Sequence, residues 1–208
     1  MTQSKATGQK PKQKRSIETR ERILEAGERL FSRDGFHATS TKKIAREAGV
    51  SVGSVYNYFP DKKAVMLEIY ARHTSRMHGM ILESLKDADF ASLGRDGTAV
   101  TRMIVDQSVK LHSFSPEFHR EMSLLRYSDP DFAALNAQEM MRIVGMLVSI
   151  LEPARENLRV DDLEAAAYVI SSAVEEVVHS IKMFDAPMDE ARLAAALADM
   201  IHSYLFTT

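Results

Sequence analysis

The chain has 208 residues, of which 45% are apolar and none is cysteine. This composition can bury a core, and the lack of thiols excludes disulfide frameworks, thiolate metal sites and cysteine catalysis. The formal net charge is −2, yet residues 1–63 hold 14 Lys and Arg against 7 Asp and Glu, and the remainder holds 13 against 22. The charge pattern therefore predicts a polyanionic partner for the N-terminal third only.

Residues 1–15 are polar and basic and show no apolar periodicity, so we expect a disordered arm that lies on DNA phosphates or is simply solvated. No apolar signal-peptide region follows the arm, and the chain has no run of about 18 apolar residues. We therefore expect a soluble cytoplasmic protein with no membrane partner.

Apolar residues recur at helical spacing along the rest of the chain, beginning with Ile23, Ala26 and Leu30. Helix-ending or helix-starting residues interrupt the pattern at Asp34-Gly35, Pro60-Asp61, Ser115-Pro116, Asp129-Pro130, Pro153, Asp161-Asp162 and Asp185-Ala186-Pro187. No segment alternates as a strand would. The sequence predicts an all-α protein of about nine helices, one of them long and beginning near Asp61.

Residues 40–59 have the spacing of a helix-turn-helix motif. Ala45 is small where the two helices cross, Gly49 suits a sharp turn, and Ser51 suits the N-cap of the second helix. The predicted packing residues are Ile44, Ala48, Val50, Val55 and Tyr58. A plain helical hairpin with a glycine turn is the alternative, although it does not explain the basic charge of this region.

The run from Thr19 to about Leu67 resembles the N-terminal domain of the tetracycline-repressor (TetR) family. The resembling residues are Thr19-Arg20, Ile23-Leu24, Leu30-Phe31, Gly35-Phe36, Thr39-Ser40-Thr41, Ile44-Ala45, Ala48-Gly49-Val50-Ser51, Gly53, Val55-Tyr56, Tyr58-Phe59 and Lys62-Lys63. The resemblance implies a DNA-binding domain over residues 16–76 and an all-α ligand-binding and dimerisation domain over residues 77–208. It also implies that the long helix joining them acts as a lever.

The resemblance places a set of residues on operator DNA: Thr41, Lys42, Ser51, Val52, Gly53, Ser54, Tyr56, Asn57, Tyr58, Lys62 and Lys63. Val52 suits a thymine methyl group, where many relatives carry Lys or Arg, and Asn57 suits an adenine edge or a phosphate. Tyrosine hydroxyls and the lysines suit phosphates. Packing for Tyr58 and Phe59, and simple solvation for Lys42 and Lys43, are the competing interpretations.

The C-terminal part carries Met and aromatic side chains that suit an adaptable apolar pocket. The predicted ligand-binding residues are Met103, Gln107, Phe118, Met122, Tyr127 and Met146, with Gln107 as a polar anchor. Ordinary core packing is the alternative for each. The seven histidines show no metal-ligand spacing, so no metal and no cofactor are expected.

Two apolar stripes near the C-terminus exceed what a small domain needs to bury, and the resemblance assigns this region to dimerisation. The predicted interface residues are Ala166, Ile170, Val174, Val177, Ile181, Leu193, Leu197, Met200 and Tyr204. We therefore expect a homodimer.

Together these features predict a ligand-responsive DNA-binding regulator, most simply a repressor that a hydrophobic or amphipathic effector releases from its operator. An activator or an architectural DNA-binding protein without an effector is the alternative. A helical enzyme is a further one, but the chain has no phosphate-binding glycine loop, nucleophile elbow or HExxH motif. The effector, the operator sequence and the controlled genes are not encoded in any motif.

Overall fold

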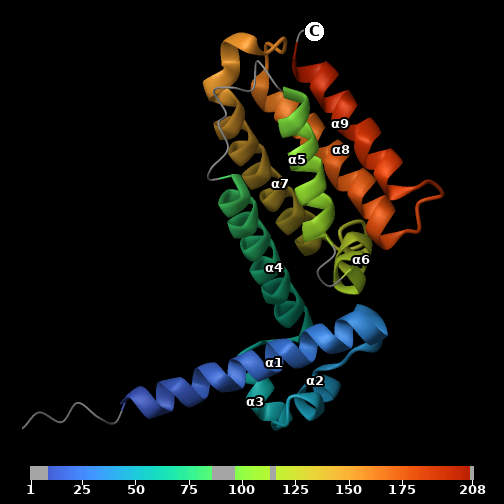
Figure 1. Cartoon of the computed structure of the whole chain (residues 1–208). Helices are drawn as coiled ribbons and strands as arrows, with labels where there is room; N and C mark the ends of the chain where they lie inside the picture. Colours follow the sequence, from blue (N-terminus) through green and yellow to red (C-terminus); the bar gives the residue numbers. More distant parts are fainter. Residues whose placement is uncertain (1–8, 86–96, 113–115, 207–208) are drawn as a thin grey trace, which may run out of the picture. The chain divides into compact units, whose positions relative to one another are not determined.

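The structure is a computed structural model that describes residues 9–85, 97–112 and 116–206. In these ranges the chain forms nine α-helices, one 3-10 helix and an isolated bridge between Leu158 and Phe206, but no strand (Figure 1). The predicted all-α fold is therefore confirmed. The chain divides into two compact units, residues 1–73 and 74–208, so the boundary lies three residues before the predicted one.

The first unit contains α1 (Gln9–Ala38), α2 (Thr41–Glu47), α3 (Val52–Tyr56) and the start of α4 (Lys62–Leu85). Because α1 begins at Gln9, residues 9–15 are helical where a disordered arm was predicted, and the first eight residues lie outside the described ranges. Near its end α1 is interrupted at Gly35, whose φ of 79° belongs to the left-handed region that glycine favours.

The core of the first unit is built from one apolar face of each helix. The buried side chains include Ile23, Leu24, Leu30 and Phe31 of α1, Ile44 and Ala45 of α2, Val55 of α3, Phe59, and Val65, Met66 and Ile69 of α4. Gly27 allows α1 and α4 to approach closely, because a Cβ at this position would lie 2.7 Å from Cγ1 of Val65. Two ion pairs also join these helices: Arg72 of α4 pairs with Glu21 of α1, and Arg20 of α1 pairs with Glu68 of α4.

The second unit contains the rest of α4, then α5 (Gly97–Leu111), α6 (Pro116–Leu125), α7 (Pro130–Leu151), the 3-10 helix η2 (Glu152–Asn157), α8 (Leu163–Met183) and α9 (Glu190–Leu205). Helix α5 packs against α9, and α7 packs against α8 (Figure 1). Their shared core includes Val105, Val144, Leu151, Ile170, Leu197 and Ile201.

Side-chain caps start three of these helices, at or near the predicted interruptions. Asp129 accepts a hydrogen bond from the backbone N–H of Asp131 at the start of α7, with Pro130 in the first turn. Asp162 and Asp189 cap α8 and α9 in a similar way. Ser115, predicted to cap α6, lies outside the described residues. Each cap satisfies a backbone donor that the first helical turn leaves unpaired.

Residues Pro130–Asn157 are long and apolar enough, by length and composition alone, to cross a membrane, although the sequence predicted no such segment. The apolar residues of α7 have another use in this fold. Phe132, Met140, Val144 and Leu147 are buried, and α7 packs along α8. Burial accounts for only part of the hydropathy of this segment, because 22% of its most apolar window is buried.

Candidate nucleic-acid interface

The turn between α2 and α3 has the backbone geometry that the motif requires. Gly49 adopts a φ of +65°, its N–H donates to the carbonyl of Arg46, and the N–H of Val50 donates to the carbonyl of Ala45 at 3.0 Å. These two bonds form the Schellman ending of a helix, which reverses the chain through a left-handed residue. Ile44, Ala45 and Val55 are fully or almost fully buried, so the crossing of the two helices is held by apolar packing.

Serine side chains begin both helices. Ser40 accepts from the N–H of Lys43 at 3.2 Å, and Ser51 accepts from the N–H of Ser54 at 3.0 Å. The predicted N-cap at Ser51 is therefore confirmed. The Ser51 hydroxyl also lies 2.7 Å from the Ser54 hydroxyl, so these two predicted DNA contacts share one hydrogen bond in this structure.

The outer face of α3 carries apolar and polar groups that face solvent. Val52 is 37% exposed and Tyr56 is 55% exposed. Gly53 and Asn57 are also exposed. Such a surface of exposed apolar and polar groups suits contact with base edges in a major groove.

The remaining predicted DNA contacts differ in how far their side chains are exposed. Lys42 is exposed, whereas Thr41, Tyr58 and Lys63 are half-buried. The Tyr58 hydroxyl lies 3.1 Å from the Ser16 hydroxyl of α1, so Tyr58 also contributes to packing. Phe59 is 3% exposed and is a core residue, as the packing interpretation held.

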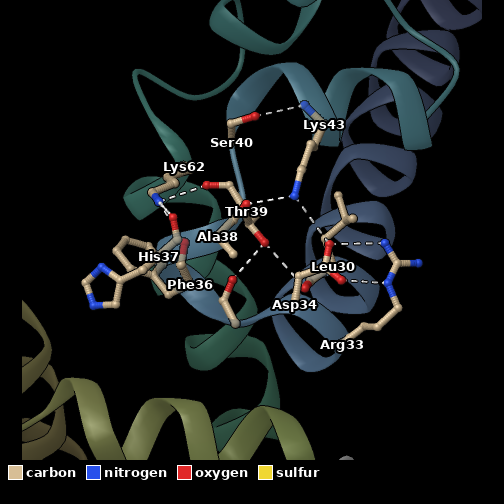
Figure 2. A network of polar contacts seen from close by, with 11 residues as sticks. Leu30, Arg33, Asp34, Phe36, His37, Ala38, Thr39, Ser40, Lys43 and Lys62 are labelled. Atoms are coloured by element: carbon tan, nitrogen blue, oxygen red, sulfur yellow. Dashed lines mark hydrogen bonds and ion pairs between the residues drawn. The ribbon is translucent and has the colours of Figure 1, made fainter.

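Lys62 differs from its prediction as a phosphate contact. Its ammonium group donates inward to the backbone carbonyls of Phe36 at 2.7 Å and Thr39 at 2.8 Å (Figure 2). Partial burial lowers the pKa of Lys62. Sequence reasoning missed this role because the end of α1 and the start of α4 are more than 20 residues apart in the chain.

In the second unit, the six predicted ligand-binding residues do not share one environment. Phe118 and Met122 are buried, Met103, Gln107 and Met146 are half-buried, and Tyr127 is 79% exposed. A cavity of about 560 Å³ opens between the end of α6, α7 and α8. Of the six residues it includes only Tyr127, so the predicted pocket residues do not converge on it.

This cavity has a mixed lining. Its residues are Arg126, Tyr127, Ala133, Asn136, Ala137, Met140, Met141, Tyr168, Ser172, Glu175 and Glu176. Arg126 donates to Glu175 at 2.6 Å and to the Tyr127 hydroxyl at 2.7 Å. Burial raises the pKa of Glu175, against the opposing effect of Arg126. The cavity therefore combines aromatic and methionine surface with an ion pair.

The fold also gathers three histidines that the sequence spacing did not connect. The ring of His112 lies 5.8 Å from that of His119 and 5.2 Å from that of His179, measured between centroids. Ser123 lies 3.4 Å from Nδ1 of His179. Burial lowers the pKa of His179 to about 3, aided by the charges of His112, Arg126 and His119. Within the described ranges no group of three His, Asp or Glu side chains is arranged to hold a metal ion.

The structure corrects part of the predicted dimer interface. Ala166, Ile170 and Leu197 have exposed fractions of 1%, 3% and 4% and belong to the core of the second unit. Val174 and Val177 pack against the same core. Ile181 and Leu193 are half-buried, whereas Met200 and Tyr204 are exposed. The apolar stripes of the two helices were predicted correctly, but most of their residues pack in the core of the protomer itself.

The geometry of the first unit and the all-helical second unit define a helix-turn-helix regulator. The family model described as "Bacterial regulatory proteins, tetR family" matches residues 23–69, and the one described as "Tetracyclin repressor-like, C-terminal domain" matches residues 98–205. The second match alone covers more than half of the chain. The protein belongs to the TetR family of transcriptional regulators, as the resemblance of residues 19–67 implied.

Curated relatives match about a third of the chain. The chain is 41% identical to the transcriptional regulator AcrR of Shigella flexneri over 66 residues, which are 32% of this chain and 31% of AcrR. It is 33% identical to the transcriptional regulator UidR of Escherichia coli K12 over 72 residues, 35% of this chain and 37% of UidR. The matches thus span about a third of each of these relatives.

Solved structures match over almost the whole chain. A transcriptional regulator of Saccharomonospora viridis in complex with choline superposes with a TM-score of 0.72 at 19% identity, over 92% of this chain and all of that one. The SmeT–triclosan complex superposes with a TM-score of 0.68 at 22% identity, over 91% of this chain and 92% of SmeT. At these identities the likeness shows the shared fold.

Proposed function

We propose that the chain is a ligand-responsive repressor that reads a palindromic operator with α3 and is released from it by a small hydrophobic or amphipathic effector. The observation that supports this most is the exposed face of α3, where Val52, Tyr56 and Asn57 lie on a capped helix-turn-helix. The basic charge of residues 1–63 supports contact with phosphates.

The test begins with duplexes that the full-length protein selects from a random-sequence library. We expect a selected duplex to bind far more tightly than a random duplex at moderate salt, since specific sites typically exceed non-specific ones by factors of about 10³–10⁷. Removing the Tyr56 or Asn57 side chain by alanine substitution should cost about 1–3 kcal/mol of binding free energy. Equal binding of selected and random duplexes by the wild-type protein would refute sequence-specific reading.

For the effector we propose only a chemical class. Choline and triclosan, named with two structural neighbours, are small molecules of the size that a helical regulatory domain encloses. We propose that this chain binds a molecule with an apolar body, and that this binding lowers the affinity of the protein for DNA. Linkage then requires that bound DNA lowers the affinity for the effector by the same factor, typically about 5–150-fold. A compound found by thermal-shift screening, titrated with and without the selected duplex, tests this coupling, and turnover of that compound would favour an enzyme.

We propose that the regulator is a cytoplasmic homodimer, joined through the outer faces of α8 and α9. The exposed apolar residues on these faces are Tyr168, Val169, Met200 and Tyr204. The two α3 helices of one dimer would lie in successive major grooves about 34–36 Å apart, as the recognition helices of helix-turn-helix dimers do. The interface thus retains Met200 and Tyr204 from the sequence prediction and replaces its buried members.

A further inference from the structure

Backbone carbonyls at and just after the end of α1 accept hydrogen bonds from lysines of two other helices. A helix leaves its last four carbonyls without intrahelical partners. Here the carbonyls of Phe36, His37 and Thr39 accept hydrogen bonds from the ammonium group of Lys62, at 2.7, 3.4 and 2.8 Å (Figure 2). The carbonyl of Ala38, which lies between them, accepts from the ammonium group of Lys43 at 2.9 Å. Four successive carbonyls therefore accept hydrogen bonds from one lysine of α4 and one of α2, and the carbonyl of Phe36 also accepts from the N–H of Thr39 at 3.3 Å.

The ammonium group of Lys62 also lies 4.4 Å from the centre of the Phe36 ring, within the range of a cation–π contact. Phe36 is itself buried, and its ring lies 5.8 Å from that of Phe31 in the core. The charge is thus held between backbone carbonyls and an aromatic face. An ammonium group has three N–H donors, and the three carbonyls account for all of them.

We propose that Lys62 is a positioning residue, which fixes the start of α4 to the α1–α2 connection and thereby orients α2 and α3 for base reading, and that it does not act as a phosphate contact. The proposal rests on the proposed DNA-binding function. Residues 36–39 lead directly into Ser40, the N-cap of α2, so their placement sets where α2 begins. Helix α4 continues without a break to Leu85 in the second unit. Through Lys62, a movement of α4 would therefore act directly on the connection that leads into α2.

Two roles for Lys62 predict different effects on DNA binding. A phosphate contact adds affinity for every sequence, so its loss weakens selected and random duplexes alike and lowers the log–log salt slope by about one. A positioning residue affects base reading, which requires the correct placement of α3. Its loss weakens the selected duplex, leaves the random duplex nearly unchanged, and leaves the salt slope on random DNA intact.

The experiment compares K62M and K62Q in the full-length protein, using a duplex selected by the wild-type protein and a random duplex across a salt series. Methionine removes both charge and donors, whereas glutamine removes the charge but keeps two amide donors. We expect K62M to lose about tenfold or more of the specificity ratio, and K62Q to lose clearly less. The matched control is K42M, which removes an exposed lysine from the first turn of α2 and should weaken both duplexes alike.

Equal weakening of both duplexes by K62M and K62Q, with the salt slope lowered by about one, would overturn the proposal in favour of a phosphate contact. A lower melting temperature with an unchanged specificity ratio would overturn it too, since Lys62 would then serve stability alone. If K62M does not fold, the K62Q and wild-type ratios decide between the two roles. Failure of the wild-type protein to distinguish the duplexes would instead count against the proposed function.

Discussion

A Cβ atom placed on Gly27 would lie 2.7 Å from Cγ1 of Val65 and 3.2 Å from Cδ1 of Ile69. Real Cβ atoms do not approach other atoms so closely, and Val65 is fully buried and stiff at χ1, so it has little freedom to move away. Gly27 is therefore the residue that sets the spacing between α1 and α4 at this contact.

We predict that G27A lowers the free energy of unfolding by about 1–2 kcal/mol, because overpacking outweighs the gain in helix propensity from alanine. Urea unfolding measures this. The variant V65A alone should also lose stability by leaving a cavity, while the double variant should be less destabilised than the sum of the two singles. A G27A protein at least as stable as the wild type would show that the contact relaxes without cost.

Gly53 gives the opposite prediction. A Cβ on this residue would meet only the Ser51 hydroxyl, at the ordinary contact distance of 3.9 Å. We therefore expect G53A to fold with unchanged or slightly greater stability, since alanine favours helices by up to about 1 kcal/mol. If the backbone of α3 approaches DNA at this point, the added methyl group should weaken binding to the selected duplex by about tenfold, or 1.4 kcal/mol.

Fluorescence anisotropy with a labelled duplex measures the effect of G53A. The matched control is G145A on α7, where a Cβ would meet no atom within 4 Å. It makes the same chemical change in the regulatory unit and should leave DNA binding unchanged. Wild-type affinity in G53A would place the backbone of α3 farther from DNA than we propose.

The exposed faces of α8 and α9 predict how to make a monomer. Met200 is 50% exposed and Tyr204 is 42% exposed, one helical turn apart on α9. The double variant M200E/Y204E should stay folded, because neither side chain belongs to the core, and should dissociate because two buried charges per protomer disfavour the interface. Light scattering at micromolar concentration gives the mass.

The control for dissociation is I17E, which places one glutamate on an exposed apolar position of α1. It should keep the mass of the wild type. A dimeric M200E/Y204E protein would move the interface away from this part of α9. A charge at Leu197, by contrast, should unfold the second unit, because Leu197 is 4% exposed.

The buried histidines predict a pH-dependent stability. In the folded protein, burial lowers the pKa of His112, and it lowers the pKa of His179 to about 3. In the unfolded chain both groups have the ordinary pKa near 6.5. The unfolded chain thus binds more protons as the pH falls below about 6.5, so the free energy of unfolding decreases toward acid, by up to about 1.4 kcal/mol per pH unit for each histidine.

Urea unfolding between pH 7.5 and pH 5 tests this prediction in a range where ordinary carboxylates change little. The variant H179N keeps a polar group in place of Nδ1 but removes the titration. Its stability should depend less on pH than that of the wild type. A pH dependence of equal slope in both proteins would assign the effect to other groups.

The sequence by itself determined most of the local structure, because the responsible interactions span only a few residues. The N-cap at Ser51 and the left-handed turn at Gly49 depend on neighbours within five positions, so both were predictable from the sequence. Helix periodicity likewise identified the stripes of α8 and α9.

Only the tertiary structure decided which partner each of those groups has. Periodicity shows that Ala166, Ile170 and Leu197 share an apolar face, but it does not tell whether a second copy or the protomer's own α5 and α7 cover that face. Burial within the protomer settled this. Similarly, the inward turn of Lys62 and the meeting of His112 with His179 join segments more than 20 residues apart. Such contacts depend on how helices pack, and no local pattern encodes that.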